Sequence, residues 1–435
     1  MRRSLILILF LLLAGLQNGF SQATEGDEAR SGSVYSGFGI GMPSDMANAE
    51  IRAMGIIGVS YNYLFTPGLN NPAFWSRGRL TRGTAGFNMA SYNVTSPTAS
   101  DKNTIFEAGF VNIVFPLIPN ELGVSAALYP YTRQNYRVLS REVINQGTPD
   151  SLAYAVNNQG FGGVNKLEFG IGWSPVKNLS IGYAPSLVFV TNTRTELFIF
   201  DPSADLTNTS VDNILNGYTL GHRFGLLYTL ESIRNDEDYL QFGATYTPAL
   251  DIKLKRKQEV QKSVGANATI LVDLLGNQSS NGNLRLPHDF AAGVTYFASP
   301  LFNVSLEGQL QQWSGFENEL NPGEEQFLTD RLRIGSGFQY HPYKTNINTF
   351  LSNFKYSAGV SYDSGHLNIN NEKIQTLWLS GGIGLFSPRN FSSFDLAVQY
   401  GIRGESSNNL IRENILAISL SINLTELFFN RPKLN

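Results

Sequence analysis

A histidine beside an aspartate is the first arrangement in this sequence that could support chemistry. His288 precedes Asp289, two of the three partner types of a hydrolytic triad, and the other histidines are His222, His341 and His366. Neighbouring residues in a strand point to opposite faces, and no motif for a nucleophile accompanies the pair. The sequence therefore predicts no catalytic residue and a protein that is not an enzyme.

The remaining polar residues do not indicate a metal, a cofactor or a nucleic acid. Metal sites need clustered histidine, cysteine or carboxylate ligands, whereas this sequence has no cysteine and only scattered histidines. A net charge of −3 gives no sign of a surface that binds a phosphate backbone. One basic run, Lys253, Lys255, Arg256 and Lys257, is predicted to border an outer loop, where it contacts either lipopolysaccharide phosphates or only water.

The segments that must position these groups alternate with a period of two. Between residues 160 and 174, apolar side chains occupy every second position, namely Leu167, Phe169, Ile171 and Trp173. A turn containing Pro175 follows, and the alternation resumes from 179 to 190. The opposite face carries mainly glycine, serine and alanine with little charge, as expected of a barrel whose outer face meets lipid.

Segments of this kind repeat along most of the chain and predict an all-β, transmembrane antiparallel barrel of about 14 strands. The predicted strands are 81–95, 103–116, 121–138, 160–174, 179–199, 217–231, 239–257, 284–297, 302–316, 329–341, 353–364, 373–387, 392–404 and 411–424. Short links alternate with long polar ones, as periplasmic turns alternate with outer loops. The link 341–353 is long where a short one is expected.

Composition and targeting agree with this fold. Charged residues make up only 15% of the chain, against the usual quarter, and Phe and Tyr number 29 and 19. Residues 1–23 resemble a signal peptide, and no later apolar run reaches the length of a spanning helix. We expect a multi-pass barrel in the outer membrane of a Gram-negative cell. Aromatic residues near strand ends are expected to form interfacial girdles: Trp75, Trp173, Trp313, Tyr183, Tyr228, Tyr246, Tyr340 and Trp378.

The N-terminal region differs from the rest of the chain. Residues 24–30 are acidic and polar, and residues 31–79 are rich in Gly, Asn and Pro without sustained alternation. This stretch is too apolar for a free linker. We predict that residues 24–79 form a plug in the lumen of a barrel spanning 80–435, the alternative being a cap on one end of the barrel.

Several motifs resemble the FadL/TodX-type outer-membrane transporters of hydrophobic compounds, in a Bacteroidota-like form. The segment "RAMGIIGVSYNYLFTPGLNNPAFWSR" is similar to the family's passage from plug to barrel and contains Asn71, Pro72 and Ala73. "SPVKNLSIGY" resembles its central hairpin, "LRLPHDFAAGVTY" a later strand pair, and "RENILAISLSINLTELFFNRPK" its C-terminus. The resemblance implies a 14-stranded barrel with an N-terminal hatch that lets small hydrophobic molecules, of the long-chain fatty acid or aromatic hydrocarbon type, diffuse inward.

A proline inside the third predicted strand is the candidate for an opening in the wall. Pro130 lies between Tyr129 and Tyr131, and because proline cannot donate to the ladder it implies a bulge, a kink or an unpaired side. In the FadL-type family an inward kink of the third strand opens the wall sideways. These three residues are therefore predicted to form a lateral opening, the alternative being a plain bulge near the outer rim.

Apolar residues of the predicted plug are the candidates for ligand binding. An apolar ligand gains nothing from crossing a water-filled tube, so a plugged lumen with an apolar pocket suits such a cargo better. The predicted pocket residues are Phe38, Ile40, Met42, Met54, Ile56 and Ile57. Packing of the plug against the wall is the alternative role for each.

Two other functions remain open. The predicted outer loops are mostly polar, which suits a FadL-like barrel that docks an exported protein, as a scaffold in type IX secretion does. A porin for polar solutes would need a charged, unplugged lumen. The expected partners are therefore a small hydrophobic ligand and outer-membrane lipid, including lipopolysaccharide, with an exported protein as the alternative and no nucleic acid.

Overall fold

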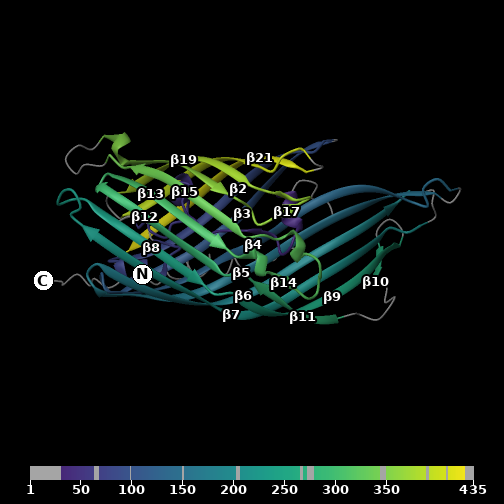
Figure 1. Cartoon of the computed structure of the whole chain (residues 1–435), viewed down its shortest axis with the longest axis horizontal. Coiled ribbons are helices and arrows are strands. Elements are labelled where there is room, and N and C mark those ends of the chain that lie inside the picture. The colour runs from purple at the N-terminus through teal and green to yellow at the C-terminus, as the bar shows by residue number, and fades with distance from the viewer. Residues whose placement is uncertain are drawn as a thin grey trace. The chain divides into compact units, whose positions relative to one another are not determined.

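Consecutive strands pair around a closed, 14-stranded antiparallel barrel (Figure 1). The computed structural model describes residues 31–62, 68–97, 99–148, 151–201, 206–264, 268–271, 279–342, 349–387, 391–407 and 410–426. Strand β2 (Thr81–Thr95) pairs with β21 (Arg412–Glu426), which closes the barrel. The predicted signal peptide, residues 1–23, lies outside the described residues.

Ten of the remaining wall strands are continuous. They are β3 (Ser100–Ile118), β4 (Leu122–Ile144), β5 (Leu152–Val176), β6 (Leu179–Phe200), β7 (Thr209–Glu231), β13 (Phe302–Gln311), β15 (Arg331–Tyr340), β16 (Phe354–Asp363), β19 (Thr376–Ser387) and β20 (Ser392–Arg403). Each overlaps a predicted strand, although β5 and β7 begin eight residues before their predicted starts at 160 and 217. The structure confirms the length of the predicted link 341–353, because β15 ends at Tyr340 and β16 begins at Phe354.

The other two wall strands are interrupted at one level. β8 (Tyr239–Thr247) continues as β9 (Leu250–Val264), and β11 (Ser279–Leu286) continues as β12 (Asp289–Ser299). The two pairs keep the same register across the break. Pro248 and Pro287 lie in the two gaps, where a residue without an N–H group cannot join a ladder.

The outward faces of the short strands are apolar and exposed. Ten residues suffice for β13, which matches the 9–11 residues that a tilted strand needs to cross a bilayer. Its outward residues Phe302, Val304, Leu306 and Leu310 are all at least 37% exposed. This barrel lies in the outer membrane as a multi-pass protein. Within the described residues, no helix is long and apolar enough to cross a membrane.

The opposite part of the wall is much taller. Strands β4, β5, β6 and β7 have 22–25 residues each, and in Figure 1 they extend to the right beyond β13 and β15. Short turns join the strands at the other end, which is therefore the periplasmic end. The excess length of the tall strands, together with β9, β10 (Ala268–Leu271) and β11, then lies beyond the outer membrane surface.

The elements outside the wall are short. In the N-terminal segment, defined here as residues 31–79, these are η1 (Val34–Gly37), β1 (Met42–Pro43), α2 (Ala49–Ala53) and η2 (Pro72–Arg77). In the outer loops they are η4 (Trp313–Gly315), β14 (Glu317–Asn318), η5 (Glu325–Phe327), β17 (Asn368–Ile369) and β18 (Glu372–Lys373), and η6 (Phe350–Asn353) precedes β16 at the periplasmic end.

Two predicted girdle residues were assigned wrongly. Trp75 and Trp313 are each only 1% exposed, because η2 and η4 carry them into the interior. Trp173, Tyr228 and Tyr340 are exposed on strands near the periplasmic end, as a girdle requires. Alternation along the strands identified the outward residues correctly, but it carried no information on loops that fold inward.

Candidate functional site

Glycines of the wall allow the backbone of the N-terminal segment to lie directly against the strands. A Cβ atom added to Gly243 would lie 1.8 Å from the Val59 carbonyl oxygen, and one added to Gly359 would lie 1.9 Å from that of Met54. Gly335 and Gly337 are in equally close contact with Gly55 and Met54. The small-residue face noted in the sequence is therefore the inner face, and it fits the backbone of this segment.

One carboxylate of the wall binds a run of backbone N–H groups. Glu307 of β13 is 1% exposed, and it accepts hydrogen bonds from the backbone N–H groups of residues 57–60. The N–H of Ile57 lies 2.9 Å and that of Ser60 2.7 Å from its oxygens, and the Ser60 hydroxyl donates a further bond of 2.7 Å. Successive N–H groups in such a curved segment form an anion-binding concavity.

Helix α2 is fixed by a buried ionic cluster. Glu50 of α2 lies 3.1 Å from the ammonium of Lys355, which also lies 3.0 Å from Asp395 of β20. All three side chains are 1–2% exposed. Tyr61 and Gln339 donate to the same Glu50 oxygen, so the charges are paired and hydrogen-bonded, as burial requires.

The start of the segment is attached in a similar way. The Ser33 hydroxyl donates to Glu413 of β21 at 2.8 Å, and the N–H of Val34 donates to the same carboxylate at 3.0 Å. Arg403 of β20 lies 3.1 Å from Glu413 and completes the pair. Charged groups on the wall therefore hold the segment at three separate levels.

The Asn-Pro-Ala motif begins η2. The Asn71 side chain accepts from the N–H of Ala73 at 3.0 Å and donates at 2.9 Å to the carbonyl groups of Val59 and Leu226. Pro72 occupies the first helical position, where its missing N–H costs nothing. The motif therefore ties the segment to itself and to strand β7, which explains its residue types.

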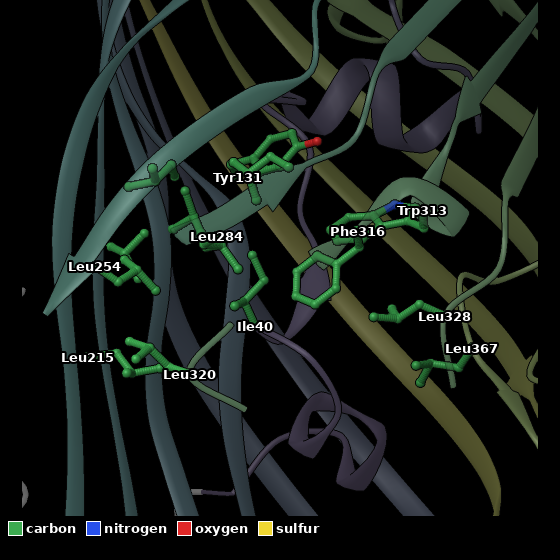
Figure 2. Close-up of a cluster of buried hydrophobic side chains, with 14 of the residues drawn as sticks. Ile40, Tyr131, Leu215, Leu254, Leu284, Trp313, Phe316, Leu320, Leu328 and Leu367 are labelled. Atoms are coloured by element: carbon green, nitrogen blue, oxygen red, sulfur yellow. The ribbon is translucent and has the colours of Figure 1, made fainter. Parts of the chain in front are cut away.

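An apolar cluster joins the N-terminal segment, the outer loops and the inner face of the wall (Figure 2). Tyr35 and Ile40 come from the N-terminal segment, and the loop residues Trp313, Phe316 and Leu328 pack against them. The wall contributes Tyr131, Val164, Val188, Val190, Leu215, Ile252, Leu254, Leu284 and Leu286, and the other loop members are Leu320, Leu367, Ile374 and Leu410. Folded-in loops thus form a lid whose inner surface is apolar.

A neutral histidine lies at the edge of this cluster. The rings of His366 and Trp313 are 5.1 Å apart, and His366 is 1% exposed in the loop between β16 and β19. Burial, together with the charge of Arg331, lowers the pKa of His366 to about 3. The side chain is therefore uncharged at neutral pH, as an apolar lid requires.

The six predicted ligand residues do not form one group. Ile40 joins the lid cluster, with Phe38 and Met42 packed at its edge. Met54 and Ile56 belong to a second cluster with Tyr61 and Phe297. The sixth, Ile57, packs with Val59 and Ala291. Each contacts the wall or the loops, which agrees with the packing role considered for them.

The wall is incomplete between β3 and β4. Their pairing ends at Val111 and Leu128, although both strands continue outward and β3 stays paired with β2 as far as Ser100. We call the unpaired stretch, residues 100–110 of β3 and 129–144 of β4, the seam. β1 pairs with β4 through Met42 and Pro43, so the N-terminal segment takes the place of the missing neighbour.

The segment follows β4 along the seam. The N–H of Gly32 donates to Asn135 at 2.9 Å, and that of Ser44 donates to Tyr131 at 2.9 Å. Gln134 and Thr132 donate in return to carbonyl groups of the segment at 3.0 and 2.8 Å. The two backbone bonds occupy part of the open edge of β4, and the two side-chain bonds hold the segment beside it.

The predicted opening residues lie at the lower end of the seam. The register of β4 against β5 shifts between Pro130 and Thr132, as expected for a bulge. Tyr129 and Tyr131 are both buried and point inward. Above them Arg133 lies 2.7 Å from Glu107 of β3, an ion pair that spans the seam.

The sequence matches the BamG family model over residues 1–435. The chain belongs to the BamG family. The FadL/TodX resemblance holds at the level of fold, since the matching family model is BamG and not FadL. The comparison with curated proteins found no match.

Solved structures with the same fold as this BamG-family chain are outer-membrane transporters of hydrophobic compounds. The toluene transporter TbuX of Ralstonia pickettii has a TM-score of 0.58 at 15% identity, covering 88% of this chain and 98% of that one. A FadL homologue from Pseudomonas aeruginosa scores 0.60 at 12% identity, with 88% and 99% covered. The toluene transporter TodX of Pseudomonas putida scores 0.55 at 16% identity, with 89% and 99% covered. At these identities the likeness establishes the fold.

Sequence reasoning missed the charged residues that anchor the N-terminal segment of the BamG-family barrel. Neither Glu307 nor Lys355 was a candidate site residue in the sequence. Their sign in the sequence was a charged residue on a strand face otherwise made of small residues. Such a charge is equally compatible with a water-filled lumen and with a buried partner. Only the structure distinguishes the two.

Proposed function

We propose that this barrel lets small hydrophobic molecules diffuse passively across the outer membrane and leave sideways through the seam. The observation that carries the proposal is the early end of the β3–β4 ladder, at Val111 and Leu128. At no other junction between described wall strands do both strands continue outward after the ladder between them has ended. A hydrophobic molecule that leaves through the wall enters lipid directly and avoids water.

On this proposal residues 24–79 act as a plug that closes the resting state. The segment lies along the unpaired edge of β4, so a small shift of residues 32–44 would uncover the seam. Phe38, Ile40 and Met42 belong to this moving part and would contact the cargo. Fatty acids and aromatic hydrocarbons are the proposed cargo classes, and TbuX and TodX, described as toluene transporters, support the second.

The experiment compares Pro130→Ala with the wild type in cells that lack the chromosomal copy. Uptake of labelled toluene and of a labelled long-chain fatty acid is measured at equal protein levels. Pro116→Ala is the matched control, because Pro116 lies in the paired, periplasmic half of β3. We expect slower uptake only in Pro130→Ala, since an added N–H favours a regular strand at the bulge. Equal uptake in all three strains would argue against exit at this point.

A second candidate function is a scaffold that binds an exported protein at the outer surface. The observation that favours it is the filled lumen, in which the N-terminal segment and the folded-in loops pack together around one apolar cluster. A scaffold needs no path for a solute, and its tall wall offers surface outside the membrane. If cells without the protein show a defect in secretion but take up both labelled compounds normally, the scaffold replaces the channel.

A further inference from the structure

Three lysines form a column on the outer face of β9. Lys253, Lys255 and Lys257 alternate with the inward residues Ile252 and Leu254, and all three side chains are exposed. Because successive residues on one face of a strand are two positions apart, neighbouring ammonium groups start about 7 Å from each other. Like charges at this spacing repel one another unless an anion lies between them.

The neighbouring carboxylates neutralise only the outermost lysine of the column. Asp251 lies below it, 3.9 Å from Arg285, and Glu259 above it pairs with Lys257. Glu319 faces the next strand, where it accepts hydrogen bonds from Asn283. Within the part of the chain that the structure describes, Lys253 and Lys255 form no ion pair.

The column begins where the wall leaves the membrane. β8 has 9 residues and crosses the hydrocarbon region from the periplasmic turn, so β9 lies beyond the break at Pro248. At that level the outer leaflet presents the phosphates and sugars of its glycolipid. β9 and its neighbours β7 and β11 are in the part of Figure 1 that extends past the short strands.

Apolar and aromatic side chains continue the column toward the membrane. Tyr218 is paired with Lys253 and is 75% exposed, and Leu220 is 67% exposed. Phe224 follows on the same face of β7 at 46%. From the outer end of the strip toward the membrane centre, a neighbouring lipid would contact the lysines first, then the aromatic ring of Tyr218, and then the apolar side chains.

We propose that this strip, Lys253, Lys255, Lys257, Tyr218, Leu220 and Phe224, binds one phosphorylated glycolipid of the outer leaflet. Its phosphates lie against the lysines, its sugar lies on Tyr218, and an acyl chain lies along Leu220 and Phe224. Such a site requires the outer-membrane location of the barrel and not the proposed transport function. Lipid bound here would fix the barrel at a defined depth in the leaflet.

The test measures lipid A binding by native mass spectrometry of the full barrel released from detergent. The variant K253Q/K255Q/K257Q is compared with K102Q/K177Q/K373Q, which removes the same charge from three exposed lysines elsewhere. A basic residue near an anionic surface contributes about fivefold in affinity, so we expect the first variant to lose on the order of a hundredfold. The control variant should bind as the wild type does.

Three further measurements decide the outcome. Dephosphorylated lipid A lacks the groups that the lysines would contact. It should therefore bind the wild type and the first variant equally weakly. Inorganic phosphate in excess should displace little lipid, since it lacks the acyl and sugar contacts. Equal lipid A binding by both triple variants, equal binding of both lipid forms, or complete displacement by phosphate would each overturn the proposal.

Discussion

Replacing Glu307 by alanine should release the N-terminal segment without unfolding the barrel. The carboxylate accepts from four backbone N–H groups, those of residues 57–60, and from the Ser60 hydroxyl. Each buried donor left without a partner costs about 1–3 kcal/mol. The Ser60 hydroxyl can donate instead to Thr295, 2.8 Å away, so at the lower bound the four N–H groups together weaken the local structure by on the order of 4 kcal/mol.

Hydrogen exchange of the amides of residues 57–60 measures this effect directly. Since 1.36 kcal/mol corresponds to a factor of ten, the exchange rates of these amides should rise on the order of a thousandfold or more in Glu307→Ala. Amides of the wall strands should keep their protection. Glu237→Ala, in an exposed periplasmic turn, is the control for loss of a carboxylate. Unchanged protection at residues 57–60 in Glu307→Ala would refute the anchoring role.

Three further perturbations test the same packing. Gly243→Ala should raise exchange at the neighbouring segment and lower the unfolding temperature, whereas Gly83→Ala, whose added methyl would meet no atom within 4 Å, should change neither. Lys355→Met should destabilise the protein by about 3–5 kcal/mol in urea unfolding, because two buried carboxylates lose their cation. The pKa of His366 is depressed in the folded state, so the stability linked to its neutral form is complete above about 6.5 and is lost as the pH falls toward about 3. His366→Asn should flatten that part of the stability curve.

The barrel itself could be predicted because its outward residues face lipid. Phe302, Val304 and Leu306 occupy every second position of β13 and are exposed, and a period of two is visible in sequence. The break in the wall at Pro248 was not predicted, since both halves of that strand alternate normally and share one register. The position of the bulge at Pro130 could be predicted from the sequence, because proline has no backbone N–H to donate to the ladder.

The contents of the lumen could not be predicted to the same extent. The contacts of Glu50 with Lys355 and of Ser33 with Glu413 join residues that are more than 300 positions apart, and no local pattern encodes them. The inward folding of Trp313 was missed because a tryptophan at a strand end suits a girdle equally well. The Asn71 motif was recognised by resemblance, while its role as a cap on η2 came from the structure.

On the proposed function, movement of the N-terminal segment away from the seam opens the route for cargo. Met42 and Arg133 are directly paired, so cysteines at both positions lie at a separation that a disulfide can bridge, and the chain has no other cysteine. Uptake of labelled toluene by cells with this double variant should fall to background on oxidation and return on reduction. Equal uptake in the oxidised and reduced states, both above the level of cells without the protein, would contradict the claim.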